Sequence, residues 1–195
     1  FSEQKVTLIS HDPDAIYKVA AALLFAQSKL PLEVLESTLR TAGKEEVARL
    51  FDMVTSCREN RRHKSQRALE RAQYTFEIVA DFGMYRDLQR HRTLTQERQR
   101  LTCHYGYSIP QEIINAGLHS KYKEALERAK EAYETIAKDL PEEAQYVVPM
   151  AYNVRWYQSV NLRALQWMCE LRSQPAGHPA YRKIARRLVE LVVAS

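Results

Sequence analysis

Hydrophobic residues recur along this chain with two periods, and each period predicts a different kind of element. Alternation at every second position predicts strands over residues 5–10, 74–81 and 150–160. A helix over residues 150–160 is the alternative, because short apolar runs do not separate the two periods. In the strand interpretation, the residues on one side are Met150, Tyr152, Val154, Trp156 and Val160, with Asn153, Arg155 and Tyr157 on the other.

Apolar residues spaced three and four positions apart predict helices between these strands. The first helix is expected to be capped by Asp12 and to open at Pro13, and two more are expected over residues 31–42 and 44–59. A longer apolar stripe over residues 118–140 predicts one long amphipathic helix. The combined pattern predicts an α+β fold in which a mixed sheet is flanked by several helices.

Positive charge is concentrated in one part of the chain. The whole chain has 29 Lys and Arg and 24 Asp and Glu, a formal net charge of +5. Residues 58–100 alone hold 11 Lys and Arg and 6 Asp and Glu, which is also +5. The densest part, RHRTLTQERQRLT, runs from Arg90 to Thr102. Guanidinium groups make paired, charge-assisted hydrogen bonds to phosphate, so this segment predicts an anion site. A solvated helix end rich in arginine is the alternative.

A second basic stretch, NRRHKSQR at residues 60–67, has no apolar face and predicts a basic loop. Together with residues 86–100 it could follow the phosphates of a nucleic acid. A basic nucleic-acid-binding helical domain is therefore one interpretation of the chain.

Asn161 is well placed to cap the helix that follows the third predicted strand. Asn161, Leu165, Met168 and Arg172 then recur along one stripe, which puts Arg172 on an apolar face. A charged group there is costly unless an anion or a carboxylate meets it, so we expect Arg172 at a site or an interface. A position in the last helical turn, where it would neutralise the helix dipole, is the alternative.

The length of 195 residues, 45% of them hydrophobic, predicts a single domain over residues 1–195. Cys57, Cys103 and Cys169 are widely spaced, which argues against a disulfide framework and a zinc site and favours a reducing, cytoplasmic compartment. Neither a membrane span nor a signal peptide is present in the sequence pattern. The chain begins with Phe1 rather than Met, which suggests a piece of a longer protein.

Three blocks of the sequence resemble the flavin-dependent thymidylate synthases. Arg90, His91 and Arg92 match the opening of that family's R-H-R-x-x-S-x-N-x-x-S-x-R signature, and residues 69–78 are similar to its F-E-H-x-x-F-T-F-x-V segment. The third block, residues 148–173, is similar to its L-P-L-x-x-x-T-R-F-x-W-T-x-N-A-R-x-L-x-x-F-x-x-L-R segment, with Arg155, Asn161, Arg163 and Arg172 in register. The blocks agree in order and in spacing.

The resemblance implies a reductive methylation of deoxyuridylate to thymidylate. In that family FAD carries hydride, NADPH reduces the flavin, methylenetetrahydrofolate supplies the carbon, and arginines rather than a cysteine nucleophile polarise the pyrimidine. The positions matching cofactor-binding residues are Arg90, His91, Arg92, Asn161 and Arg163. Arg90 and Arg172 match substrate-binding positions, and Arg172 would be catalytic.

Other positions depart from the family pattern, mainly where the pyrimidine nucleotide binds. Loss of two phosphate-binding arginines and one serine contact would remove roughly 4 to 8 kcal/mol, about three to six decades in dissociation constant. We therefore expect a degenerate domain of this fold with lost or reduced activity, and an active thymidylate synthase is the alternative. The departures are Asp87 for a Gln, Arg100 for a Ser, Thr102 and Gln145 for two Arg, and Trp167 for an Asn that contacts the flavin.

The resemblance also implies a protein partner, because the family builds its active sites between the subunits of a homotetramer. We expect either a homo-oligomer or a sister domain of the same fold, which would make residues 1–195 one half of a tandem protein. The implied small-molecule partners are deoxyuridylate, NADPH and methylenetetrahydrofolate. A membrane or a nucleic acid is not expected as a partner.

Overall fold

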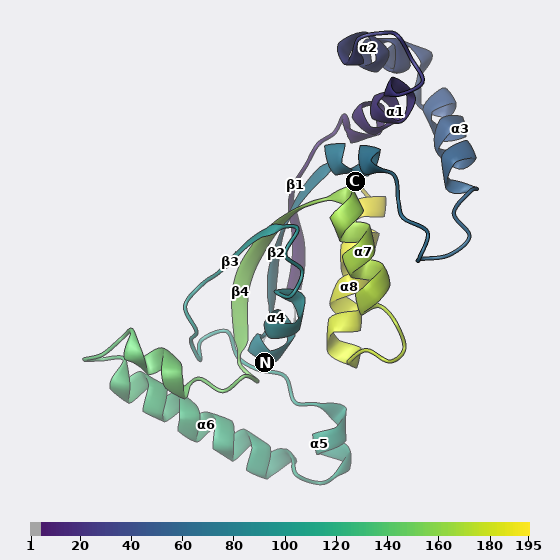
Figure 1. The fold of residues 1–195 in the computed structure, drawn as a ribbon. Helices are drawn as coiled ribbons and strands as arrows, with labels where there is room; N and C mark the ends of the chain where they lie inside the picture. Colours follow the sequence, from purple (N-terminus) through teal and green to yellow (C-terminus); the bar gives the residue numbers. More distant parts are fainter. Residues whose placement is uncertain (1–4) are drawn as a thin grey trace. The chain divides into compact units, whose positions relative to one another are not determined.

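The computed structural model describes residues 5–195, in which strands, helices and two short 3-10 helices follow one another (Figure 1). The strands are β1 (Lys5–His11), β2 (Gln73–Asp81), β3 (Thr95–Arg98) and β4 (Asn153–Asn161). The α-helices are α1 (Ala15–Phe25), α2 (Leu32–Ala42), α3 (Lys44–Thr55), α4 (Phe82–Leu88), α5 (Gln111–Asn115), α6 (His119–Ile136), α7 (Leu162–Arg172) and α8 (Pro179–Val193). The 3-10 helices are η1 (Arg67–Arg71) and η2 (Glu143–Val147). The predicted α+β class is confirmed.

The four strands form one antiparallel sheet in the order β1-β2-β4-β3. A backbone hydrogen bond of 2.9 Å from Phe82 N to the Tyr152 carbonyl lies at one end of the β2–β4 pairing. In the same register Thr75 lies opposite Ser159, and their hydroxyl oxygens are 2.8 Å apart. The sheet is therefore antiparallel, and the predicted mixed sheet is wrong, because the hydrophobic pattern carries no information about strand direction.

The predicted strands are confirmed, with shifts at their ends. In β4 the buried residues Val154, Trp156 and Val160 alternate with the exposed Tyr157, which decides for a strand rather than a helix. Met150 lies in the turn before the strand and its side chain is half exposed, so it does not belong to the buried face. The short strand β3 was not predicted, because its sequence TQER has no apolar alternation.

The described residues group into two compact units. The first contains residues 5–7, 77–92 and 96–157, and the second contains residues 8–76, 93–95 and 158–195. The division passes through all four strands, so each unit contains a part of every strand. No helix in the described part of the chain is both long and apolar enough to cross a bilayer.

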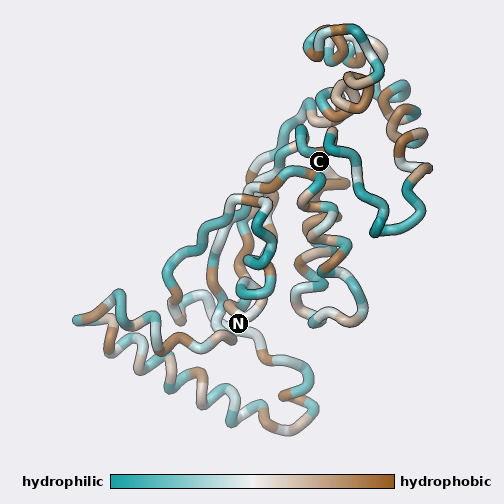
Figure 2. The backbone as a smooth tube through the Cα atoms, viewed as in Figure 1, coloured by the Kyte–Doolittle hydropathy of each residue, from teal (hydrophilic) through white to brown (hydrophobic). Residues whose placement is uncertain are grey.

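The first unit contains the long amphipathic helix α6, which is confirmed between His119 and Ile136. Apolar residues recur along it among polar ones (Figure 2). Leu126 and Tyr133, two turns apart, are buried in a cluster that includes Tyr107 and Tyr152. The Tyr152 hydroxyl donates a hydrogen bond of 2.8 Å to the Leu126 carbonyl, which fixes the helix against this cluster.

The second unit contains the helical pair α7 and α8, which lie side by side (Figure 1). Leu165 and Met168 of α7 and Ile184 and Leu188 of α8 are buried, as expected for two facing apolar stripes. Helices α1, α2 and α3 pack on one another in the same unit. The core of this unit therefore supports the N-terminal end of α7, where the candidate site lies.

Several helix boundaries differ from the prediction, including the end of α6, which lies at Ile136 rather than at residue 140. The first helix begins at Ala15 rather than Pro13, and its N-cap is Asp14 rather than Asp12. The Asp12 carboxylate accepts a hydrogen bond of 3.0 Å from Asp14 N, so it stabilises the turn before the helix. Helix α3 ends at Thr55 instead of residue 59, and the irregular backbone that follows includes the predicted basic loop.

Candidate functional site

The N-terminus of α7 is organised by Asn161, whose side-chain oxygen accepts a hydrogen bond of 2.9 Å from Ala164 N. This is the N-cap that the sequence predicted. The cap places Arg163 in the first turn of α7.

Arg163 connects three segments of the second unit. Its Nη1 lies 2.7 Å from a carboxylate oxygen of Glu70 in η1, and its Nε donates to the Ser65 carbonyl at 3.1 Å. Hydrogen bonds from Arg67 and Arg163 hold the pKa of the Glu70 carboxyl below its usual value. Arg163 therefore fixes η1 and the end of the basic loop against α7.

Arg58 holds the other end of the basic loop, which we define as residues 58–66. Two of its nitrogens donate to the two Glu170 oxygens, each at 2.7 Å. The same guanidinium donates to the carbonyls of His63 at 2.9 Å and Arg61 at 3.3 Å. A third link joins the Ser65 hydroxyl to Gln166 of α7 at 2.6 Å. The loop is thus held to α7 by polar contacts along its length.

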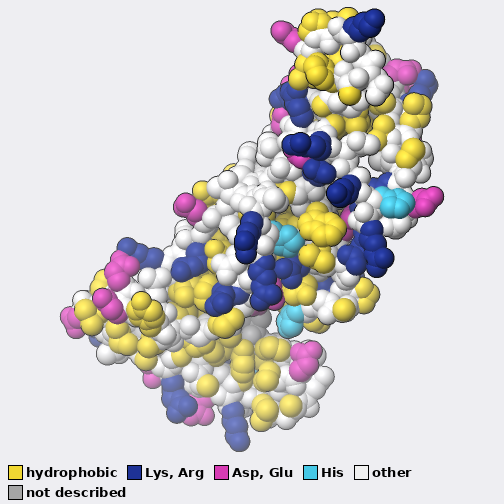
Figure 3. Space-filling model, viewed as in Figure 1, with side chains coloured by type: hydrophobic (Ala, Val, Ile, Leu, Met, Phe, Trp, Pro, Cys, Tyr) yellow, Lys and Arg dark blue, Asp and Glu magenta, His cyan; other side chains and the backbone are white. Residues whose placement is uncertain are grey.

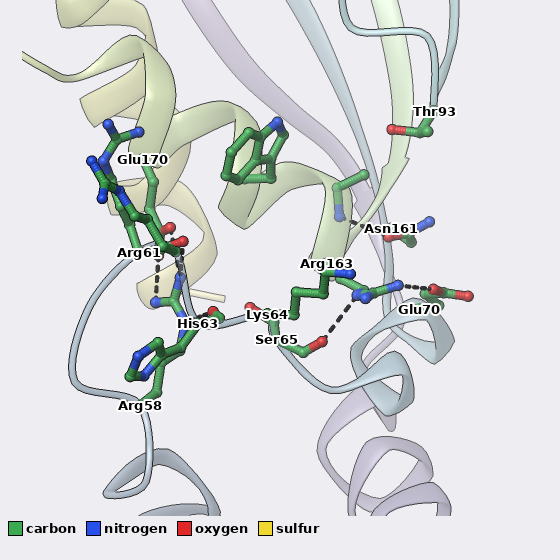
Figure 4. A pocket seen from close by; sticks show the side chains of 13 residues that line it. Arg58, Arg61, His63, Lys64, Ser65, Glu70, Thr93, Asn161, Arg163 and Glu170 are labelled. Atoms are coloured by element: carbon green, nitrogen blue, oxygen red, sulfur yellow. Dashed lines mark hydrogen bonds and ion pairs between the residues drawn. The ribbon is translucent and has the colours of Figure 1, made fainter.

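The basic loop, η1 and the start of α7 enclose an open pocket of about 490 Å³, within the size range of small-molecule sites (Figure 4). Figure 4 shows Arg61 and His63 projecting from the loop, with Asn161 and Arg163 on the α7 side of the pocket. Thr93, which directly follows Arg92 in the sequence, also lines it. Two of the five predicted cofactor-binding residues, Asn161 and Arg163, are therefore brought together in one pocket.

The pocket has an excess of positive charge. Its lining contains five Lys and Arg side chains and two carboxylates, Glu70 and Glu170. Both carboxylates are already paired, with Arg163 and Arg58 respectively. Three exposed cations, Arg61, Arg62 and Lys64, form no ion pair with a carboxylate in the described residues. Figure 3 shows Lys and Arg side chains gathered over this loop.

Trp167 of α7 adds an aromatic surface to the same pocket, with half of its side chain exposed. An exposed indole beside unpaired cations suits a ligand that combines an aromatic ring with an anionic group. The site can therefore bind and orient a nucleotide-like molecule.

The other predicted cofactor-binding residues lie in the first unit. Arg90, His91 and Arg92 follow α4, which Asp81 caps by accepting a hydrogen bond from Met84 N at 2.8 Å. Arg90 is mostly exposed, and its Nη2 lies 3.7 Å from the Asp87 carboxylate. Asp87 stands where the resembled family has a glutamine, so it places a negative charge beside a predicted anion-binding arginine.

The replaced nucleotide-binding positions are engaged in contacts within the first unit. Arg100 forms an ion pair with Glu142. The Thr102 hydroxyl oxygen accepts a hydrogen bond of 2.8 Å from His104 N, and the Gln145 side-chain oxygen accepts one of 2.9 Å from Leu101 N. Thr102 and Gln145 therefore support local backbone.

Arg172 is the last residue of α7, and its guanidinium carbon lies 5.3 Å from the centre of the Tyr181 ring in α8. This is a cation–π contact between neighbouring helices. The position at the end of the helix matches the dipole-neutralising alternative.

The cysteine thiols offer no activated nucleophile at the two buried positions. Burial raises the pKa of Cys103 to about 11 and that of Cys169 to about 12. Both thiols are therefore protonated at neutral pH.

Sequence reasoning did not select Arg58, Arg61, Arg62, Lys64 or Glu170 as site residues. The available signal was the density of cations in NRRHKSQR, which predicted the loop but not its attachment to α7. Trp167 was noted only as a departure from the family pattern. In the structure its exposed indole lines the pocket together with these cations.

Fold and pocket together define an α+β domain with an open cationic pocket. The family model described as "Thymidylate synthase complementing protein" matches residues 7–195, and the chain belongs to this family. The resemblance found in the sequence is confirmed.

Similar proteins are longer than this chain. A "UPF0159 protein" of Chlamydia pneumoniae is 54% identical over 192 residues, covering 98% of this chain and 36% of that protein. A "UPF0159 protein" of Chlamydia muridarum is 51% identical over 191 residues, with coverage of 98% and 36%. One from Thermoplasma acidophilum is 33% identical over 189 residues, with coverage of 95% and 38%. The chain thus spans little more than a third of the length of these relatives.

Proposed function

We propose that this chain is a domain of the thymidylate synthase complementing family that binds FAD but does not by itself methylate deoxyuridylate. The observation that carries the proposal is a contrast between two groups of positions. Asn161 and Arg163 line a cationic pocket with room for a ligand. Thr102 and Gln145, which replace nucleotide-binding arginines, are instead used in backbone contacts.

The chemistry of the available groups supports a flavin dinucleotide as the ligand. FAD, when bound, supplies a hydride carrier, and the chain has to hold its phosphates and place its ring. Exposed arginines at Arg90 and Arg92 offer guanidinium groups that suit phosphates. In the second unit, Asn161 and Arg163 line a pocket with room for a ligand. Trp167 offers an aromatic face where the family has an asparagine.

The deoxyuridylate side is weaker in this chain. A hydrogen bond to a charged group contributes about 1.5 to 3 kcal/mol, so the missing contacts correspond to a loss of several decades in affinity. Asp87 adds repulsion toward a phosphate dianion and already lies 3.7 Å from Arg90. The nucleic-acid-binding alternative assumed a helical domain, and that part is wrong, because the chain contains a four-stranded sheet.

The visible absorbance of the purified protein and a FAD-dependent shift in melting temperature test flavin binding. We expect a FAD-dependent shift in the parent protein and its loss when Arg90 and Arg92 are both changed to Ala, because the double variant lacks both guanidinium groups. The fold should be retained, because both side chains are exposed and outside the core. Arg187→Ala, also exposed, is the matched control and should retain the shift. An unchanged shift in the double variant would place the flavin elsewhere.

Calorimetric titration with deoxyuridylate tests the second half of the proposal. We expect weak or undetectable binding, and no thymidylate from FAD, NADPH, methylenetetrahydrofolate and deoxyuridylate. Micromolar affinity or turnover would instead assign this chain to the active enzymes.

We also infer that the domain acts with a second copy of the same fold, as a homo-oligomer or as a sister domain in a longer chain. The longer-chain form is supported by the relatives, of which this chain covers 36% to 38%. Light scattering on the chain and the mass of the natural protein test the two forms separately. A monodisperse monomer at high concentration would refute the first, and a natural chain of about this length would refute the second.

A further inference from the structure

We propose that a second pocket, in the first unit, binds a zwitterionic ligand of the α-amino-acid class. The pocket has a volume of about 430 Å³ and lies between residues 103–107 and one side of α6. None of its described lining residues stands at a specified position of the family's motifs. The proposal therefore goes beyond the flavin function, and it concerns a different unit from the cationic pocket.

One wall of this second pocket is a stripe of alternating charge on α6, formed by Lys123, Glu127, Lys130 and Glu134. Because these residues follow one another at steps of four, three and four, their side chains lie on the same side of the helix. Ion pairs along a solvated helix are the usual explanation of such a stripe. Only the last pair fits that explanation, since Lys130 Nζ lies 3.8 Å from a Glu134 carboxylate oxygen.

Lys123 and Glu127 are the charges that a ligand can meet. Lys123 is exposed and forms no ion pair with a carboxylate of the described residues. Glu127 accepts a hydrogen bond of 3.1 Å from the Tyr107 hydroxyl instead of pairing with a lysine. Lys also precedes Glu by four positions, which is the less favourable order for a pair within a helix. Two opposite charges are therefore open to groups that enter the pocket.

This pair of charges selects a ligand that carries both signs. A simple anion on Lys123 would be repelled by Glu127, and a simple cation on Glu127 would be repelled by Lys123. Residues four apart on a helix have Cβ atoms about 5 to 6 Å apart. The ammonium and the carboxylate of an α-amino acid are joined through one carbon, so a single molecule can bridge the two side chains.

The floor of the pocket specifies the rest of the ligand. It contains Cys103, Tyr107 and Tyr152, all buried, and the two tyrosine rings make an edge contact with their centres 5.2 Å apart. Burial raises the pKa of Cys103 to about 11 and also raises the pKa of both tyrosines, so the floor is uncharged at neutral pH. Aromatic surfaces of this kind suit an apolar or aromatic side chain. We therefore expect an apolar amino acid.

The test uses L-phenylalanine and two analogues that each lack one charge, phenethylamine and hydrocinnamate. Calorimetry at neutral pH measures the affinity of each for the chain. We expect phenylalanine to bind about tenfold more tightly than either analogue, because each analogue leaves one charge of the pocket unmatched. Equal affinity for the three compounds would overturn the proposal, and so would the absence of binding for both phenylalanine and L-leucine.

Matched variants locate the ligand on α6. Glu127→Gln keeps an acceptor for the Tyr107 hydroxyl but removes the charge, so it should lower phenylalanine affinity about tenfold and raise hydrocinnamate affinity. Lys123→Gln should lower phenylalanine affinity by a similar factor and raise phenethylamine affinity. Glu131→Gln and Lys121→Gln are the controls, because both side chains are exposed on the same helix and neither lines the pocket. Both controls should bind all three compounds like the parent.

The crossed response of the two analogues is the decisive result, because a general loss of structure would weaken all three compounds together. A uniform loss in both variants would overturn the roles given to Glu127 and Lys123. Parent-like phenylalanine affinity in both variants would show that the amino acid binds elsewhere and would refute the site. Glu127→Gln should keep the FAD-dependent shift of the parent, so failure of this proposal and failure of the flavin proposal are distinguishable.

Discussion

The carboxylate of Glu170 accepts two hydrogen bonds, each 2.7 Å long, from the guanidinium of Arg58, although 112 positions separate them in the sequence. About a quarter of each side chain is exposed, so the pair is shielded more than most surface ion pairs. The contact is one of the links that hold the basic loop on α7.

Glu170→Gln should release the loop and accelerate its cleavage by trypsin after Arg61, Arg62 or Lys64. Hydrogen bonds to charged groups contribute roughly 1.5 to 3 kcal/mol, which corresponds to about a tenfold to hundredfold change in local opening. Glu190→Gln, which removes the exposed pair with Arg187, is the control and should have no effect on loop cleavage. Equal cleavage in all three proteins would show that the pair does not hold the loop.

Acid should release the loop with a midpoint below 4.5. The hydrogen bonds from Arg58 lower the pKa of the Glu170 carboxyl below its ordinary value of 4.5. A lowered folded-state pKa gives stabilisation that is complete above the unfolded value and is lost as the pH falls through the folded value. Trp167 fluorescence should follow this transition, with circular dichroism to monitor the fold. The transition should be absent in Glu170→Gln, and its persistence there would contradict the assignment.

Asn161→Asp should retain the stability of the protein but lower its affinity for anions. Loss of the cap in Asn161→Ala should lower the free energy of unfolding by roughly 0.5 to 2 kcal/mol, whereas Asp is an equally good N-cap. Asp adds a negative charge to the pocket, so anion affinity should fall although the fold is retained. Urea unfolding and calorimetry measure the two effects. Equal anion affinity in Asn161→Asp would indicate that the ligand does not approach the cap.

Restoring the family's arginines should destabilise the first unit. Changing Thr102 and Gln145 together to Arg removes the acceptors of His104 N and Leu101 N, at a cost of roughly 1 to 3 kcal/mol. Gln145→Glu keeps an acceptor for Leu101 N and should cost less. Urea unfolding compares the variants, and an unchanged midpoint in the double variant would mean that these hydrogen bonds contribute nothing.

Gln158→Met should stabilise the protein. Gln158 is fully buried, and both polar atoms of its side chain have no hydrogen-bond partner among the described residues. An unpaired buried amide costs about 1 to 3 kcal/mol, and methionine fills a similar volume without polar demands. The same change at Gln166 should destabilise, because Gln166 bonds both Ser65 and Glu170. Thermal unfolding of both variants tests this, with a higher melting temperature expected for Gln158→Met and a lower one for Gln166→Met.

Long periodic segments could be predicted from the sequence because their own burial determines their pattern. The strand that contains Trp156, the stripe of α6 and the Asn161 cap are all local signals, and all three are confirmed. The cap of the first helix was wrong because Asp12 competes for the turn before it, and local sequence does not decide between the two roles. Short polar elements such as β3 carry no periodic signal.

The site was predictable only in part, for a physical reason. Matching Asn161 and Arg163 to a family motif requires sequence alone, and both line the pocket. The attachment of Arg58 to Glu170 depends on tertiary folding, which no local pattern records. The positions of Arg61, Arg62 and Lys64 in the pocket lining depend on that attachment and were therefore hidden in the sequence.

The double attachment of Arg163, to Glu70 and to the Ser65 carbonyl, has an evolutionary consequence. A residue that holds two segments together is under selection for folding, whether or not the chain binds a ligand. In a lineage that abandoned the flavin, this arginine would still be inherited, along with the glutamate that pairs with it. Arg92 and Trp167 are exposed side chains without such a structural role. After a loss of binding, substitutions would accumulate at these positions sooner than at Arg163.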